Sequence, residues 1–225
     1  MRIVVDNLQG PEILALLQEH LAEMRSASSP ESMHALDAAG LRKPGVTFWT
    51  VWLDSELGGC GALKELNLDH GEIKSMRTAN RHRRKGVAAT LVRHMLQEAA
   101  RRGYRQLSLE TGSLPDFAPA RALYASFGFE RCGPFGGYRE DPHSVFMTKA
   151  LVRVVTSINS PEGDHCVDIF VRDDGTFGYE EYRQDAEDMR GWFSLRRFAS
   201  QVFATERDAR ARAKATVAWL AADSP

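Results

Sequence analysis

The feature that most constrains the fold is residues 72–88, which have the pattern of a strand, a basic turn and a helix start. Residues 73–78 are mostly apolar or β-branched, as strand residues are. The basic run 81–85 follows, and Gly86 precedes an amphipathic segment. Apolar residues recur there every four positions, which places them on one helix face: Val87, Leu91, Met95 and Ala99.

A turn of small residues at a helix start exposes backbone N–H groups that no side chain covers. Those groups, with the roughly +0.5 charge at a helix N-terminus, favour a bound anion, above all phosphate. The basic side chains of residues 81–85 add positive charge around that point. The stretch therefore predicts a site for a phosphorylated ligand, although the same residues would also suit a solvated turn.

Two motifs separate these alternatives by their spacing. The first, Arg83-x-x-Gly86-x-Ala88, resembles the Gln/Arg-x-x-Gly-x-Gly/Ala pyrophosphate motif of the GNAT N-acetyltransferase superfamily. The second, at residues 120–129, resembles that superfamily's Ala-x-x-Leu-Tyr-x-x-x-Gly-Phe segment. Each motif alone is weak, but the two in this order, with a helix and a strand between them, are specific. The resemblance covers residues 1–150 and leaves the last third unassigned.

Composition and charge exclude several classes of function. The chain has 225 residues, 43% of them hydrophobic and 26% charged, as globular proteins have. A formal net charge of −1 argues against a general nucleic-acid or membrane-surface binder, and no apolar run approaches the roughly 18 residues of a membrane span. Three scattered cysteines predict reduced thiols and a cytoplasmic location rather than disulfides or a metal pair: Cys60, Cys132 and Cys166. No metal-binding motif is present.

The remaining patterns predict an α/β fold of the α+β type. Strands are expected near residues 3–5, 46–53, 60–66, 72–78, 105–111, 129–133 and 144–149, and helices near 11–25, 31–39, 86–102 and 116–127. Their order matches the GNAT fold, which implies a mixed, mostly antiparallel central sheet with helices on both faces.

The domain organisation follows from a shift in composition. Residues 1–155 are expected to form the GNAT-like domain, and the Ser-, Asn-, Pro- and Gly-rich residues 156–164 a linker. Residues 165–225 then predict a small α+β module of unknown role, with a hairpin around Asp173-Asp174-Gly175. Thr205 is expected to cap its final helix, with an apolar inner face: Ala209, Ala213, Val217 and Leu220.

The resemblance implies that acetyl-CoA is the cosubstrate. Its pantetheine amides would pair with the backbone of the strand end, and its pyrophosphate would lie on the turn before the helix. The residues implied for cofactor binding are Met76, Arg77, Thr78, Arg83, Arg84, Lys85, Gly86, Val87 and Ala88. Phe117 stands where many relatives have Asn, so it would offer apolar contact instead of a hydrogen bond.

Three residues are the catalytic candidates that the resemblance implies. Tyr124 matches the family tyrosine that donates a proton to the CoA sulfur; the alternative is a helix residue that packs on Phe129. Glu72 matches the glutamate that serves as general base in some members, and Glu110 is the second candidate. Lys74 has the same strand parity as Glu72, so it could bind an acidic substrate group or pair with a carboxylate.

The function predicted first is direct acetyl transfer from acetyl-CoA to the amine of a small molecule. Acetylation of a protein or peptide amine, with the C-terminal module as a recognition arm, is the second reading. A non-catalytic acyl-CoA-binding regulator is the third, and retention of Tyr124 and Glu72 speaks against it. Family members often dimerise, so a homodimer is one assembly that the resemblance allows.

Overall fold

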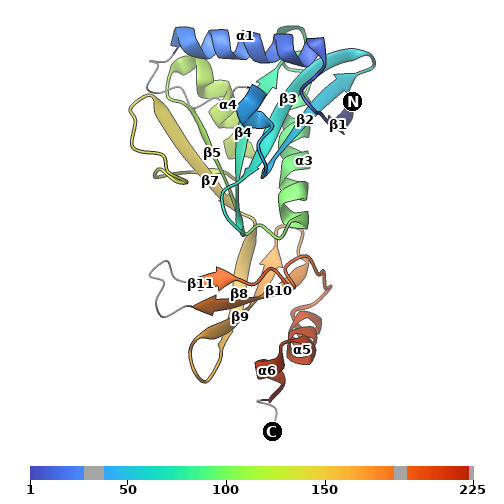
Figure 1. The fold of residues 1–225 in the computed structure, drawn as a ribbon, viewed down its shortest axis with the longest axis vertical. Helices are drawn as coiled ribbons and strands as arrows, with labels where there is room; N and C mark the ends of the chain where they lie inside the picture. Colours follow the sequence, from blue (N-terminus) through green and yellow to red (C-terminus); the bar gives the residue numbers. More distant parts are fainter. Residues whose placement is uncertain (28–37, 185–191, 223–225) are drawn as a thin grey trace. The chain divides into compact units, whose positions relative to one another are not determined.

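The computed structural model describes residues 1–27, 38–184 and 192–222 (Figure 1). The chain divides into two compact units. The first comprises Met1–Gln97 and Leu107–Lys149, and the second comprises Glu98–Gln106 and Ala150–Pro225. Within the described ranges, no helix is both long enough and apolar enough to cross a membrane.

A seven-stranded sheet in the order β1-β2-β3-β4-β5-β7-β6 forms the first unit. Neighbours from β1 to β4 pair antiparallel, and so do β6 and β7. A helix connects β4 to its neighbour β5, the kind of crossover that parallel strands require. The sheet is therefore mixed and mostly antiparallel, as predicted. Its strands are β1 (Arg2–Val5), β2 (Val46–Leu53), β3 (Glu56–Glu65), β4 (His70–Thr78), β5 (Gln106–Gly112), β6 (Glu130–Cys132) and β7 (Ser144–Ala150).

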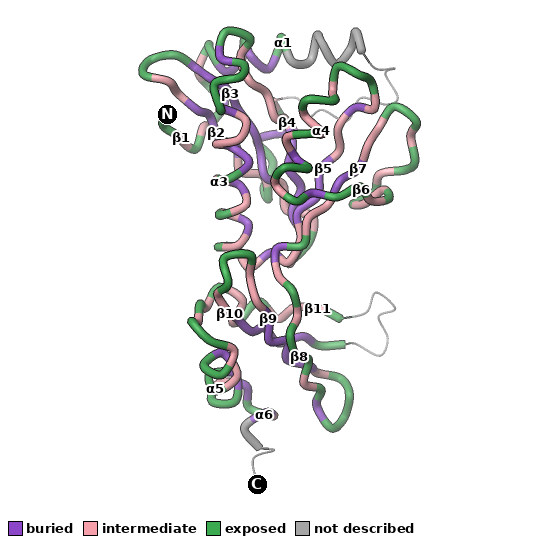
Figure 2. The backbone as a smooth tube through the Cα atoms, turned by 180° about the vertical axis from the view of Figure 1, so that it is seen from behind, coloured by how far each residue is buried: buried purple, intermediate pink, exposed green. Residues whose placement is uncertain are grey.

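Helices cover both faces of this sheet, and Figure 2 shows buried stretches along the strands between them. They are α1 (Pro11–Ala27), α2 (Ala38–Leu41), α3 (Val87–Arg101) and α4 (Ala118–Ser126). Successive residues of a strand point to opposite faces. Cys60 and Ala62 of β3 pack in the cluster that contains α1 residues, whereas Gly59 and Gly61 face α3. The predicted inner face of α3 is confirmed, because its four residues are at most 1% exposed. The helix predicted at 31–39 lies mostly outside the described residues.

β4 contains a β-bulge. Its register with β3 slips by one residue between positions 74 and 77. Residues 75–76 therefore stand opposite the single residue Gly61, and Ser75 has a φ of +52°. A bulge leaves backbone groups outside the hydrogen-bonded ladder and bends the strand. The side chains and backbone groups of β4 therefore have different orientations before and after the bulge.

The second unit holds a four-stranded antiparallel sheet in the order β11-β10-β9-β8. Its elements are β8 (Val152–Asn159), β9 (His165–Arg172), β10 (Phe177–Gln184), β11 (Trp192–Ser194), α5 (Glu206–Thr216) and α6 (Ala218–Ala222). The predicted hairpin and the Thr205 cap are present, since the Thr205 hydroxyl accepts a hydrogen bond from the Asp208 N–H at 3.1 Å. The predicted inner face is also buried, at most 5% exposed, but the helix breaks at Val217.

The predicted linker at residues 156–164 is wrong over its first part, because residues 156–159 belong to β8 and pair with β9. Burial alternates along β8, as it does in a strand with one face toward the core. The two compact units divide between Lys149 and Ala150, and residues 98–106 join the C-terminal unit.

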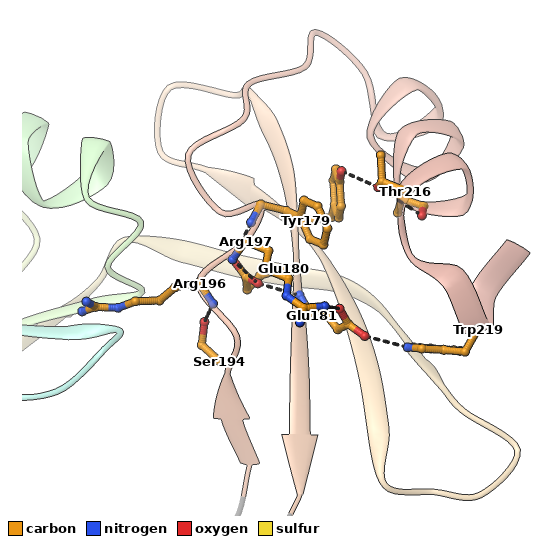
Figure 3. Close-up of polar contacts among 10 residues, drawn as sticks. Tyr179, Glu180, Glu181, Ser194, Arg196, Arg197, Thr216 and Trp219 are labelled. Atoms are coloured by element: carbon orange, nitrogen blue, oxygen red, sulfur yellow. Dashed lines mark hydrogen bonds and ion pairs between the residues drawn. The ribbon is translucent and has the colours of Figure 1, made fainter.

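Buried polar contacts fix the second unit internally (Figure 3). The carboxylate of Glu180, which is fully buried, accepts hydrogen bonds from the backbone N–H groups of residues 197–199 at 2.8–3.2 Å and of Glu181 at 2.9 Å. Glu181 accepts another from the indole of Trp219 at 2.8 Å. A buried charge is tolerated only when donors compensate it, so these bonds hold the segment after β11 against the sheet.

Candidate active site

The turn before α3 has the geometry of an anion site. A 3-10 turn, Asn80–His82, leads into it from β4, and Arg84 and Gly86 have φ of +62° and +82°. No atom lies within 4 Å of the point that a Cβ on Gly86 would occupy. The helix begins at Val87, and the first N–H groups of a helix have no partner within it. Open space thus lies beside helix N–H groups that have no partner within the helix.

These donors fit a pyrophosphate group. The side chains of Arg83, Arg84 and Lys85 are exposed around the turn, so they can surround an anion without leaving a buried environment. Backbone N–H groups with nearby cations are the donor set that phosphate oxygens require. The residues present therefore suit the phosphates of CoA.

His82, which the sequence prediction did not single out, is buried within this turn. It is 4% exposed, and its Nε2 lies 3.0 Å from Oε2 of Glu56 at the start of β3. The contact joins the turn to the β2–β3 hairpin. Sequence alone shows only a basic run, in which one buried histidine cannot be told from its exposed neighbours.

The other predicted cofactor contacts lie at the ends of β4 and β5. Residues 76–78 are half-buried; Met76 lies in the bulge, and positions 77 and 78 follow it and pair with β3. Phe117 ends a 3-10 turn, and a Cβ on Gly112 would lie 2.4 Å from its ring. The glycine at the end of β5 thus makes room for the Phe117 ring.

Glu72, Lys74 and Tyr138 form a polar triad. The Lys74 ammonium donates to Glu72 Oε1 at 2.9 Å and to the Tyr138 hydroxyl, and that hydroxyl donates to the same Glu72 oxygen at 2.6 Å. Glu72 is 1% exposed and Lys74 9%. The prediction that Glu72 and Lys74 share a face of β4 is confirmed, and the lysine pairs with a carboxylate.

The second oxygen of Glu72, Oε2, is differently placed. The Lys64 ammonium lies 3.7 Å from it, which is beyond an ordinary hydrogen bond. Although Oε2 is buried, it has no hydrogen-bond partner among the residues that the structure describes. A buried acceptor without a donor costs free energy, so a donor from a bound molecule would be accepted here.

Glu110 lies on the neighbouring strand β5 and is half-buried. Its Oε1 accepts a hydrogen bond from the Ser144 hydroxyl at 2.7 Å. Burial raises the pKa of the Tyr138 hydroxyl, and the charges of Glu72 and Glu110 raise it further. Tyr138 therefore keeps its proton between the two predicted base candidates.

Tyr124 lies in α4 and is 6% exposed. Its ring packs edge-on against Phe129, with centroids 5.9 Å apart, so the packing contact that the sequence offered as an alternative is present. Burial raises the pKa of its hydroxyl, and the charge of Glu110 adds to the effect. Tyr124 is therefore protonated at neutral pH.

Sequence reasoning missed two residues here: Tyr138, a member of the triad, and His70, which lies two positions before Glu72 on β4. The Nε2 of His70 lies 2.8 Å from the Ser108 hydroxyl, and burial lowers the pKa of this imidazole. Tyr138 lies between β6 and β7, just after Gly136 and Gly137. The only signal in the sequence was an aromatic residue in a glycine-containing loop.

Comparison with known proteins gives concordant matches. The model of the acetyltransferase (GNAT) family matches residues 13–129. The uncharacterized N-acetyltransferase YsnE of Bacillus subtilis (strain 168) is 57% identical over 151 residues, which are 67% of this chain and 100% of YsnE. The uncharacterized N-acetyltransferase YedL of Escherichia coli (strain K12) is 49% identical over 149 residues, 66% of this chain and 94% of YedL. A solved structure of a candidate acyl-CoA N-acyltransferase from Klebsiella pneumoniae is 26% identical with a TM-score of 0.54, over 67% of this chain and 97% of that one.

The fold and these matches define the class of this protein as an N-acetyltransferase with an additional C-terminal unit. The chain belongs to the GNAT acetyltransferase family, and the resemblance inferred from the two motifs is confirmed. Because 67% of this chain accounts for all of YsnE, about a third of the chain lies outside that match.

Proposed function

We propose that this protein transfers an acetyl group directly from acetyl-CoA to the amine of a small molecule. One observation carries the proposal: two complementary features lie on the same strand–helix unit. The turn before α3 has open space beside Gly86, and among the described residues the buried oxygen Oε2 of Glu72, near the start of β4, has no hydrogen-bond partner. The first suits the phosphates of CoA, and the second suits an amine N–H.

The residues that would hold acetyl-CoA follow the two motifs. N–H groups of residues 86–88, with the side chains of residues 83–85, would bind the pyrophosphate. The backbone of residues 76–78 would pair with the pantetheine amides, with an N–H near Met76 toward the thioester carbonyl. Phe117 would add apolar contact. Acetyl-CoA supplies the activated acyl group.

Two proton transfers accompany the reaction, in which an N–C bond forms while the C–S bond breaks. The amine loses a proton, and Glu72 Oε2 would accept it, with Glu110 as the second candidate base. Tyr124 would donate a proton to the departing sulfur, since its raised pKa keeps that proton available. The proposed chemistry uses no metal.

The acceptor that we propose is small because Glu72 is 1% exposed. The triad hydroxyl of Tyr138 lies over one of its oxygens at 2.6 Å, so an amine must reach the other oxygen in a confined space. A slender primary amine meets this requirement with little displacement of the surrounding side chains.

The thermal midpoint of the purified protein, measured with acetyl-CoA, with CoA and without ligand, is the first test. Binding at a hundred times the dissociation constant stabilises the native state by about 2.7 kcal/mol. CoA release is then followed with an alkylamine, an aromatic amine, an amino acid, an aminoglycoside and a lysine-containing peptide. A thermal rise with both ligands and release with a small amine support the proposal. The proposal fails if the folded protein shows no rise at millimolar ligand, or if only the peptide is a substrate.

A further inference from the structure

Tyr138 occupies a rigidly packed position for a residue between two strands. Its ring lies edge-on to Phe135, with centroids 5.2 Å apart, and against Phe146 at 5.4 Å. Its backbone N–H donates to the Phe135 carbonyl at 2.9 Å, which closes a turn over Gly136 and Gly137. Packing of this kind fixes where the hydroxyl points.

The hydroxyl joins this segment to the buried face of β4. It donates to Glu72 Oε1 at 2.6 Å while it accepts from Lys74. The Lys74 ammonium also lies 5.2 Å from the centre of the Tyr138 ring. Two donors therefore converge on Oε1, and the carboxylate cannot rotate without losing both hydrogen bonds.

We propose that Tyr138 is a positioning residue for Glu72. Its hydroxyl holds the Glu72 carboxylate ionised and turns Oε2 toward the acceptor amine. The inference rests on the proposed function, because it takes Glu72 to be the base. The inference is based on the different hydrogen bonding of the two Glu72 oxygens. Oε1 has two donors, and buried Oε2 has none within hydrogen-bond distance among the described residues. A bound amine would supply the missing donor.

The expected effect depends on every charge near Glu72. The titratable neighbours are Lys64 on β3, His70 and Lys74 on β4, Glu110 on β5 and Tyr138 itself. The lysines favour the ionised carboxylate, and the charge of Glu110 acts on the Tyr138 hydroxyl. A hydrogen bond from Tyr138 favours the ionised form of the carboxylate, so a variant without that hydroxyl should let the carboxylate bind a proton more readily.

The Tyr138→Phe variant tests the inference because it keeps the ring and removes only the hydroxyl. The matched control is Tyr179→Phe, which removes the hydroxyl of a fully buried tyrosine that is 2.8 Å from the Thr216 hydroxyl in the second unit. Thermal midpoints establish that both variants fold. The full-length protein is labelled with carbon-13 at its glutamate carboxyl carbons, and the Glu72 resonance is assigned by its loss in Glu72→Gln.

Two readouts are compared. The carboxyl titration of Glu72, followed by NMR without any ligand, should move to higher pH in Tyr138→Phe and stay in place in Tyr179→Phe. The acidic limb of kcat/KM, measured with acetyl-CoA and the best amine of the panel, should move in the same direction by a similar amount. An unmoved NMR titration overturns the positioning role, whether or not turnover is detected. A moved titration with an unmoved kinetic limb overturns the link between Tyr138 and the catalytic base.

A failure of the proposed function is distinct from these outcomes. In that case no amine of the panel releases CoA from the wild-type protein, while the NMR titration still reports on the contact between Tyr138 and Glu72.

Discussion

Gly61 of β3 and Met76 of β4 meet at the bulge: a Cβ on Gly61 would lie 2.5 Å from the Met76 sulfur. The same Cβ would lie 2.4 Å from Cε of Met95 in α3. The absence of a side chain at position 61 therefore lets the bulge and the helix approach each other.

Gly61→Ala is expected to destabilise the protein by about 1–3 kcal/mol, because an extra methyl group overpacks the core. Residues 76–78 would also shift, so the dissociation constant for CoA should rise. Gly133→Ala is the matched control, since nothing lies within 4 Å of its Cβ position. Thermal melts and calorimetric titration with CoA measure both effects. A Gly61→Ala variant as stable as Gly133→Ala would show that the neighbouring methionines move aside freely.

Much of this arrangement was predictable from sequence because it is local. The face of α3 follows from a four-residue period, and the turn before it from a glycine at a helix start. The bulge at Ser75 was not predictable, because it depends on the register against β3. The Tyr138 contact was not predictable either, because 66 positions separate it from Glu72 and no periodicity relates them.

Composition misled the prediction at residues 156–159. Ser, Thr and Asn there suggested a linker, yet β8 is an edge strand of the second sheet, where outward polar residues are expected. Ile158 was the better guide, since it packs against the core cluster of that unit.

Gly86→Ala is expected to weaken CoA binding more than it weakens the fold. The φ of +82° costs an alanine roughly 1–2 kcal/mol, and a methyl group would project into the open space where phosphate is proposed to bind. Gly163→Ala is a matched control, because Gly163 has a φ of +75° and equally open surroundings in the second unit. Both variants should lose similar stability in thermal melts. Only Gly86→Ala should raise the dissociation constant for CoA, and equal constants would argue against a phosphate site at this turn.

Glu72→Gln should reduce kcat/KM most at low pH, where free amine is scarce and a base is most needed. Glu110→Gln separates the two candidate bases, because it removes a carboxylate that is hydrogen-bonded to Ser144 and leaves the Glu72 contacts in place. The pH profiles of both variants are measured with the same amine. If Glu110→Gln lowers kcat/KM most at low pH and Glu72→Gln does not, Glu110 is the base.

Tyr124→Phe should lower kcat by about 10²-fold or more, because it removes the proposed general acid and keeps the packing on Phe129. The raised pKa of Tyr124 also predicts how the wild-type rate depends on pH. A tyrosine whose pKa lies above its usual value of 10 stays protonated throughout the neutral and mildly alkaline range. The wild-type rate should therefore show no decline below pH 10 from loss of this proton. Kinetics with a thioester whose thiol is more acidic than CoA provide a check, since a better leaving group should narrow the difference between variant and wild type.

Glu180→Gln should destabilise the second unit by about 1.5–3 kcal/mol. The wild-type carboxylate accepts four backbone N–H groups through its two oxygens. Glutamine replaces one oxygen with an NH2 group, so two N–H donors would face another donor in a fully buried place. Glu162→Gln, at an exposed position of the same unit, is the control. Urea denaturation followed by the fluorescence of Trp219, whose indole is bonded to the adjacent Glu181, reports on this unit. Equal midpoints for the two variants would show that the four hydrogen bonds to Glu180 contribute nothing net to folding.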